Sequence, residues 1–385
     1  MTDVWLGDGQ WRLPAQVGAE AQRESPDARA HPVVLETLQG APTAQVVSLV
    51  QPTALDAPSS GGAAFRALLG EDASAECLVR KDRLDVASAM RGVVADVTTR
   101  PTVSRTAVSL PLPRGVGNTA VLQVTVEYLT PTGRYGALRL AGTNVRGVGV
   151  FCSLEAPGHA LTFARMVATL VQSLEAGLVD EASARASYLV AMDGGWVGTA
   201  EQANIQRPNN KPMDLQFVSL LRVHGAALHS VDEVGVELTD AEGTLLLLRS
   251  MRRENGEMVR EGALTRFEDG RVGLKLHQDE RPADLGRANP TGMRALQNHL
   301  ARAQQQPAQP RTFLRYLPGM DPRALAEETV VLQERNANGA RFSSTLATQA
   351  GRAEAQYLVD AQGILQSSTV RWNDTQLTIT RVDHR

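Results

Sequence analysis

The two cysteines, Cys77 and Cys152, are the first residues whose type and position could do chemistry. They fit either two reduced, buried thiols or one disulfide, and a disulfide would indicate an oxidising compartment. In the chain-entropy description, a cross-link over so long a loop stabilises a fold by about 3–5 kcal/mol. No metal site is predicted, because the cysteines form no CxxC pair and only His159 lies near either of them at ligand spacing.

No motif of a known catalytic site is present: the chain has no G-x-S-x-G elbow, no H-E-x-x-H pair and no P-loop. Two pairs of neighbouring carboxylates, Glu327-Glu328 and Asp232-Glu233, would point to opposite faces of a strand. Neither pair therefore makes an acid–base couple, and we expect both to be solvated surface residues. The sequence predicts no catalytic residue, no cofactor and no metal.

The segment Gly115–Ala120 has the G-x-G-x-x-A spacing of dinucleotide-binding turns. That fingerprint requires a helix directly after it, because the helix N-terminus meets the pyrophosphate. Here apolar and polar residues alternate over Val121–Leu129, which predicts a strand. The glycines are therefore interpreted as a hairpin turn.

Four residues of the second half are candidates for ligand contacts: Trp196, Trp372, Arg315 and Arg371. Aromatic residues make up only 4% of the chain, so two tryptophans in one β-rich region could line the same cavity. The alternative is that both are anchors of a packed core. If the sheet curls into an open barrel, its concave face could take an apolar ligand, and the two arginines could supply polar contacts at the rim.

The length of 385 residues predicts two domains, because single cores tend to split before this size. We place them at residues 1–178 and 187–385, with residues 175–186 as a linker or a connecting helix. The net charge of −3 provides no basic field, so a nucleic-acid partner is not expected. No apolar run is long enough to span a bilayer, so the chain is not expected to be membrane-spanning.

The first domain is predicted to be an α+β sandwich-like unit in which an amphipathic helix lies on an antiparallel sheet. Its apolar stripe, at helical spacing, is Phe163, Met166, Val167, Leu170, Val171 and Leu174. Thr162 is the predicted N-cap and Gly177 the residue after the C-cap. Leu84–Val94 also has helical character, and Ala63–Leu69 is interpreted as one or two helical turns.

The second domain is predicted to consist of successive antiparallel hairpins. Over Glu354–Val382, alternating strands are joined by turns at Asp360–Gly363 and at Asn373-Asp374. One helix is predicted at Thr291–Ala303. The predicted fold class is therefore α+β, with an N-terminal antiparallel sheet and packed helix followed by a curved antiparallel meander or half-open barrel with one helix.

The second half resembles a β-rich bacterial envelope domain of unknown activity that accompanies transglutaminase-like peptidases in some proteins. The matching pieces are Tyr188–Gly198, Phe313–Gly319 and Ala355–Val382. The resemblance implies a curved, half-open barrel with one helix and implies no reaction. Over Val121–Leu174 the first half resembles the Mog1/PsbP α/β sandwich, in which a last strand feeds a helix that packs across the sheet; this implies a fold alone.

These observations lead us to expect a non-enzymatic, two-domain bacterial envelope protein that binds a partner protein or a hydrophobic ligand. It would be periplasmic or secreted if a leader was removed, and otherwise cytoplasmic. One alternative is a hydrolase or transferase whose site no motif reveals, and a pocket with convergent ionisable groups would favour it. The other is a cytoplasmic interaction scaffold, which two free thiols would favour.

Overall fold

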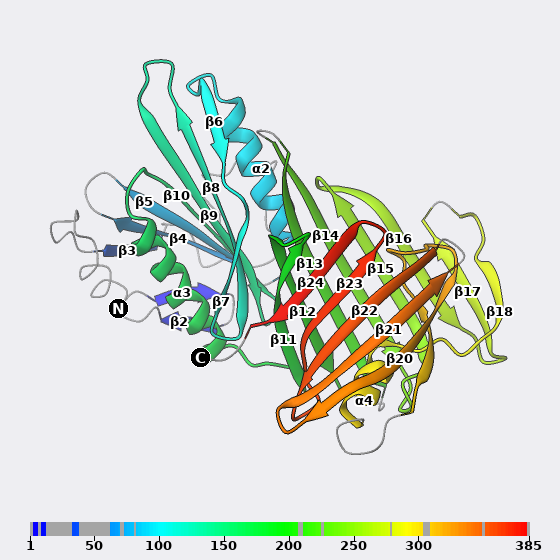
Figure 1. The fold of residues 1–385 in the computed structure, drawn as a ribbon. Helices are drawn as coiled ribbons and strands as arrows, with labels where there is room; N and C mark the ends of the chain where they lie inside the picture. The colour runs from blue at the N-terminus through cyan, green and yellow to red at the C-terminus, as the bar shows by residue number, and fades with distance from the viewer. Residues whose placement is uncertain are drawn as a thin grey trace.

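The computed structural model describes residues 3–6, 9–12, 33–37, 62–69, 73–80, 82–206, 211–224, 227–277, 279–302, 309–348 and 351–382. Within these ranges two large antiparallel sheets lie next to each other, and the pair β1 (Asp3–Leu6) and β2 (Gly9–Arg12) forms a small third one (Figure 1). The predicted α+β class, dominated by antiparallel strands, is confirmed, and neither large sheet closes on itself. No helix among the described residues is long and apolar enough to cross a bilayer.

The first large sheet has eight strands in the order β3-β4-β5-β10-β9-β8-β6, with β7 also paired to β8. Helix α3 (Ala160–Gly177) covers one face and helix α2 (Val86–Thr99) covers the other, so this sheet is buried on both sides. The strand bounds are β3 Val33–Thr37, β4 Gly62–Leu69, β5 Ser74–Arg80, β6 Arg105–Val108, β7 Leu112–Val116, β8 Thr119–Leu129, β9 Tyr135–Val145 and β10 Val148–Glu155.

The predicted amphipathic helix is confirmed as α3, with both of its ends shifted. His159, in the left-handed region at φ 62°, is the N-cap residue, whereas the predicted N-cap Thr162 is buried within the first turn. Gly177 is the last helical residue, and Leu178 takes the C-cap position. The apolar stripe fixes which face of a helix is buried, but it says little about where the helix starts and stops.

The structure tests three further predictions for segments of the first half. The helical turns predicted at Ala63–Leu69 are wrong: the segment belongs to β4, which pairs with β3 on one side and β5 on the other. A short apolar run without alternation fits either structure, and pairing on both sides decides for the strand. The helical character of Leu84–Val94 is confirmed as α2. The hairpin reading of Gly115–Ala120 is also confirmed, because β7 turns directly into β8 with Gly117 at φ 57°.

The second sheet has fourteen strands in the order β18-β17-β16-β15-β14-β13-β12-β11-β24-β23-β22-β21-β20-β19, all antiparallel. Neighbours are consecutive in sequence except where β11 meets β24, so the predicted meander is confirmed. The bounds in the first arm are β11 Ala184–Met192, β12 Gly195–Ile205, β13 Met213–His224, β14 Ala227–Thr239, β15 Leu245–Glu254, β16 Glu257–Arg266, β17 Arg271–Leu276 and β18 Ala283–Arg287. Those in the second arm are β19 Arg311–Tyr316, β20 Leu325–Asn336, β21 Gly339–Thr348, β22 Gly351–Asp360, β23 Leu365–Trp372 and β24 Thr375–Arg381.

Helix α4 (Met293–Arg302) joins the two edge strands, β18 and β19, and confirms the predicted helix of this half. Its buried residues Leu296 and Leu300 pack in one core with side chains of β19 to β22. On its other side, Gln297 donates a hydrogen bond to Gln202 of β12 at 3.0 Å. The helix therefore lies inside the curve of the sheet and contacts both arms (Figure 1).

Helix α2 belongs to the first sheet but also packs on the outer face of the second. Leu221 of β13 and Leu228 of β14 complete the hydrophobic core around α2. Asp232 of β14 accepts hydrogen bonds from the backbone N–H groups of Ala87 and Ser88, at 3.2 and 2.8 Å, and from the Ser88 hydroxyl at 2.6 Å. The helix is thus capped by a carboxylate from the other half, at the end where its dipole favours negative charge.

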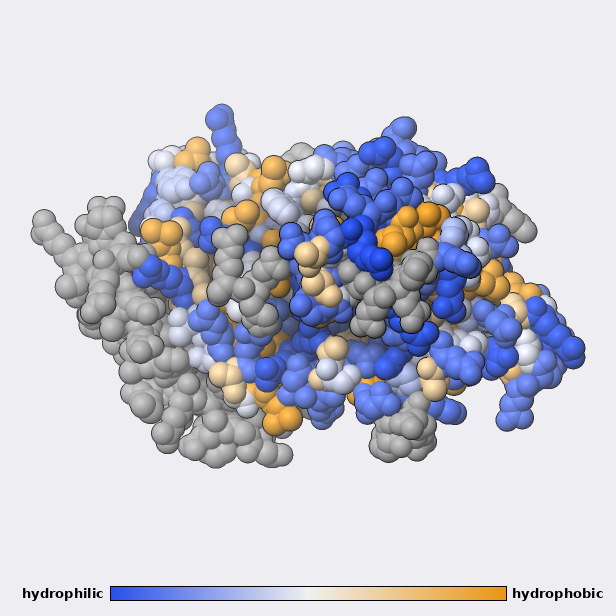
Figure 2. Space-filling view, turned by 60° about the horizontal axis from the view of Figure 1, so that its bottom comes forward, coloured by the Kyte–Doolittle hydropathy of each residue, from blue (hydrophilic) through white to orange (hydrophobic). Residues whose placement is uncertain are grey.

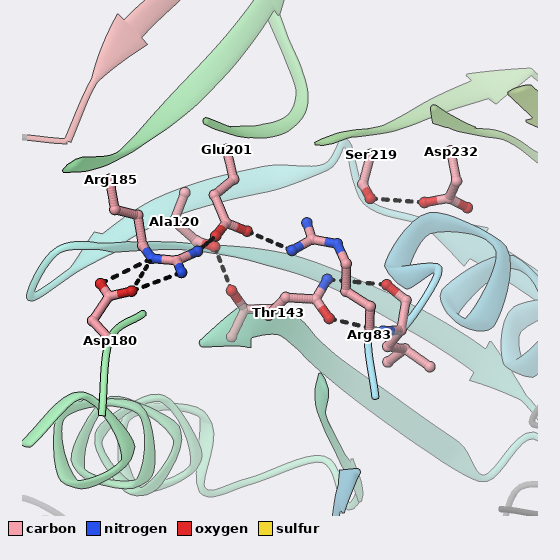
Figure 3. Close-up of polar contacts among 10 residues, drawn as sticks. Arg83, Ala120, Thr143, Asp180, Arg185, Glu201, Ser219 and Asp232 are labelled. Carbon is pink, nitrogen blue, oxygen red and sulfur yellow. Dashed lines mark hydrogen bonds and ion pairs between the residues drawn. The ribbon is translucent and has the colours of Figure 1, made fainter. Parts of the chain in front are cut away.

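A chain of ion pairs beside this cap links the same two halves (Figure 3). Arg83 donates to Glu201 of β12 at 2.8 Å, and its guanidinium lies over the ring of Phe217, 3.0 Å from the centroid. Glu201 also accepts a hydrogen bond from Arg185, which pairs with Asp180 at 2.9 Å. Because each charge has an opposite neighbour, the chain holds the segment before α2 against β11 and β12.

Replacing Asp232 by alanine is expected to lower the free energy of unfolding by about 2 kcal/mol, because α2 loses its cap and two N–H groups stay buried without an acceptor. The matched control is Asp85→Ala. Asp85 is the N-cap residue by position, yet its side chain makes no capping hydrogen bond. Its ion pair with Arg253 is partly exposed, so we expect a loss below about 1 kcal/mol. Urea denaturation measures both; equal losses would contradict the capping role of Asp232.

Candidate ligand cavity

A cavity of about 370 Å³ lies inside the curve of the second sheet. It is lined by β13, β14 and β15 of one arm, by β19 and β21 to β24 of the other, and by α4 and residues 317–320. The volume falls in the range typical of small-molecule sites. Helix α4 contacts β14 through its first residue, Met293, and the cavity is the part of the concave space that the helix does not fill.

Nine of the residues that line the cavity are leucine, isoleucine or valine. Helix α4 supplies Leu296 and Leu300, which are four residues apart and therefore share a helix face. Strand β24 supplies Leu377 and Ile379, which alternate onto one face of the strand, and β15 supplies Leu248. Such a surface offers dispersion contacts and no hydrogen bonds, which suits a flexible alkyl or ring system.

A row of polar positions crosses the cavity wall that β13, β14 and β15 form. Gln216 of β13 stands opposite Gly235 of β14, and Gly235 stands opposite Ser250 of β15. The Gln216 Nε2 and Ser250 Oγ atoms are buried and have no hydrogen-bond partner among the described residues. A Cβ atom at Gly235 would have one neighbour within 4 Å, the Cβ of Gln216 at 3.7 Å. The row therefore holds two unused polar groups on either side of open space.

Glu237 lies two residues from Gly235 along β14 and also lines the cavity. Its Oε2 accepts a hydrogen bond from the backbone N–H of Met293, the first residue of α4, at 2.7 Å. Burial raises the pKa of Glu237, and the positive charge of Arg315 and the bond from Met293 only partly offset that rise. The carboxyl group thus positions the helix N-terminus and faces the ligand space.

Arg315 of β19 reaches the cavity from a buried polar cluster. Its Nη1 donates to Oε2 of Glu328 at 2.7 Å, and the Oε1 of Glu328 accepts hydrogen bonds from the hydroxyls of Ser344, at 2.8 Å, and Tyr357. Burial alone would raise the pKa of Glu328, but Arg315 and the two hydroxyls outweigh it and lower the pKa. The cluster therefore holds a fixed cation in the wall with a matched anion behind it.

The structure does not bring the four residues predicted as ligand contacts together at one site. Arg315 lines the cavity, from its interior and not from its rim. Trp196 is 42% exposed, and Trp372 is half-buried at the edge of the α4 core. Arg371 is exposed and donates to Gln376 at 2.9 Å. Both tryptophans and Arg371 lie outside the set of residues that line the cavity.

Of the residues that line the cavity, sequence reasoning predicted only Arg315; among those it missed are Gln216, Gly235, Ser250 and Glu237. A usable signal was present, since the alternation of β14 puts residues 233, 235 and 237 on one face with two carboxylates around a glycine. Polar residues on one face of a strand normally indicate solvent exposure. Only the curl of the sheet and the position of α4 turn this face inward.

Two ionisable groups of the cavity wall, Arg315 and Glu233, are already engaged in ion pairs. Arg315 pairs with Glu328, and Glu233 pairs with Arg260 at 3.0 Å. In the described ranges there is no group of three or more His, Cys, Asp and Glu side chains that could hold a metal ion. The arrangement offers a chamber with aliphatic residues from α4, β15 and β24 and a polar row across β13 to β15.

Elsewhere the described surface offers less to an apolar molecule. On the face drawn in Figure 2, hydrophobic residues form small separate groups in a mainly hydrophilic surface. A hollow of about 230 Å³ between the two sheets is lined by small, polar and charged residues, and there Arg146 and Arg185 both pair with Asp180. The cavity of the second sheet is therefore the better site for an apolar ligand.

No protein-family model matches the chain, and no curated protein matches it. Among solved structures, the chain is similar to a β-barrel-like protein of domain of unknown function DUF1849 from Brucella abortus, with 14% identity and a TM-score of 0.42. The match covers 52% of this chain and 95% of that chain. So distant a similarity bears neither on a ligand nor on a compartment, and the two resemblances noted in the sequence stay predictions.

Proposed function

We propose that this protein binds a hydrophobic small molecule in the cavity of the second sheet and catalyses no reaction on it. The observation that carries the proposal is the aliphatic lining contributed by α4, β15 and β24 around a space of about 370 Å³. Each methylene group moved from water into such a space contributes about 0.8 kcal/mol. An alkyl chain of moderate length would therefore bind without any charged contact.

We further propose that the protein works in the bacterial envelope. The support is the disulfide between Cys77 and Cys152, which joins β5 and β10 at directly opposite positions and is buried beneath α3. Disulfides persist in oxidising compartments and are rare in the cytosol. The resemblance of the second half to an envelope domain agrees with this location.

Filling the cavity is the direct test of binding. In wild-type protein, the neutral probe N-phenyl-1-naphthylamine is expected to give a saturable rise in fluorescence. Gly235→Phe places a ring in the open space between Gln216 and Ser250 and is expected to weaken probe binding at least about tenfold. The backbone of Gly235 is not in the left-handed region, so the substitution adds no backbone strain.

The control is Gly158→Phe, at a position outside the cavity where a Cβ atom meets nothing within 4 Å. This variant should bind the probe like wild type, and the smaller Gly235→Leu should fall between the two. Circular dichroism confirms that each variant is folded. Absence of probe binding to wild type, or equal binding by wild type and Gly235→Phe, would overturn the proposed function.

A further inference from the structure

The polar row on β13 to β15 contains hydrogen-bonding groups that the protein leaves unused. Ser250 is 4% exposed, yet its Oγ has no partner among the described residues, and the same holds for Nε2 of Gln216. A buried polar atom without a partner costs about 1–3 kcal/mol. Both residues line the cavity and flank Gly235 in the register of the three strands.

The charged residues near the polar row determine which ligand group can bind above Gly235. Glu233 and Glu237 lie on the same face of β14, two residues to either side of Gly235. Glu233 is paired with Arg260, and Arg315 is paired with Glu328, whereas Glu237 forms no ion pair within the described part of the chain. A carboxylate or phosphate above Gly235 would lose its hydration between two acidic side chains, and the arginine that lines the cavity, Arg315, is already paired with Glu328. This placement is unfavourable for an anion.

A neutral group meets no such penalty. The oxygen of a hydroxyl or amide can accept from the Nε2 of Gln216, and its O–H or N–H can donate to the Oγ of Ser250 or to the Glu237 carboxyl. These are the donors and acceptors that the wall presents. The aliphatic residues of α4, β15 and β24 then cover the remainder of the ligand.

We propose that the ligand is a neutral amphiphile, an alkyl chain that ends in a hydroxyl or amide, with its polar end above Gly235. This inference rests on the proposed function, because it specifies the chemistry of the molecule held in the same cavity. It also predicts a selectivity that an apolar chamber alone would not have: the cavity discriminates against the carboxylate of the same chain length.

The test is competition against bound N-phenyl-1-naphthylamine at pH 8 by 1-dodecanol, dodecanamide and dodecanoate. The alcohol and the amide are expected to bind at least about tenfold more tightly than the carboxylate. Glu237→Gln keeps an oxygen that accepts the Met293 N–H. It should reduce this difference in affinity by strengthening the binding of dodecanoate. Ser250→Ala and Gln216→Leu should each weaken dodecanol by about fivefold and leave the probe unaffected.

The matched control is Ser230→Ala. Ser230 is also buried with an unpartnered hydroxyl, but it does not line the cavity. Its loss should leave all three affinities unchanged. If no compound displaces the probe and the probe itself does not bind, the proposed function fails. If all three compounds bind equally, or if Glu237→Gln leaves the difference in affinity intact, this inference fails while the proposed function stands.

Discussion

Glu328→Ala is expected to lower the free energy of unfolding by about 3–5 kcal/mol, because it leaves the guanidinium of Arg315 buried without its counter-ion. The side chains of Arg315 and Glu328 are 7% and 0% exposed, so water cannot replace the missing carboxylate. The hydroxyls of Ser344 and Tyr357 lose their acceptor as well. Denaturation by guanidinium chloride, followed by circular dichroism, measures the loss.

Glu327→Ala supplies the matched control for this prediction. Glu327 precedes Glu328 on β20 and is exposed on the opposite face, so its loss should change stability by less than about 0.5 kcal/mol. Arg315→Leu combined with Glu328→Leu should cost less than the sum of the two single changes, since the double variant leaves no unpaired charge. Additive losses in the double variant, or equal losses at Glu327 and Glu328, would contradict the prediction that Arg315 and Glu328 stabilise the fold as an ion pair.

The contribution of Glu328 to stability depends on pH with a definite sign. The folded-state pKa of Glu328 is lowered, since Arg315 and the two hydroxyls outweigh the opposing effect of burial. A lowered pKa means that ionised Glu328 contributes stability above its unfolded pKa, about 4.3, and that this contribution is lost as the pH falls through the folded pKa. The stability difference between wild type and Glu328→Gln should therefore be full at pH 7 and shrink in acid.

The two pairs of neighbouring carboxylates show which features of the fold can be predicted from the sequence. Strand alternation correctly predicts that Glu327 and Glu328 face opposite ways, and so do Asp232 and Glu233. The expectation that both pairs are solvated is wrong, because Glu328 and Asp232 are buried. Period-two patterning identifies two faces of a strand, but which polar face is covered depends on partners far away in sequence, here α2 for Asp232 and Arg315 for Glu328.

The cavity could not be predicted from the sequence for the same reason. Hairpin turns and alternation were enough to predict the meander, and the apolar stripes were enough to predict α3 and α4. They contain no information on how strongly a fourteen-stranded sheet curls or how much of its concave side a ten-residue helix fills. Gln216, Gly235 and Ser250 become neighbours only through the register of three strands, and their unused polar atoms become visible only once the wall is built.

Removal of the disulfide is expected to cost about 4.5 kcal/mol, the chain-entropy value for a cross-link with a sequence separation of 75. The measurement compares guanidinium denaturation of wild type, with and without reductant, with that of a double variant, Cys77→Ala and Cys152→Ala. Reductant should destabilise wild type to nearly the level of the double variant and leave the variant itself unchanged. Because both sulfurs lie in the core beneath α3, reduction should proceed slowly in native buffer and quickly once the protein unfolds. If thiol titration of unreduced native protein finds two free thiols, the argument for an oxidising compartment loses its basis.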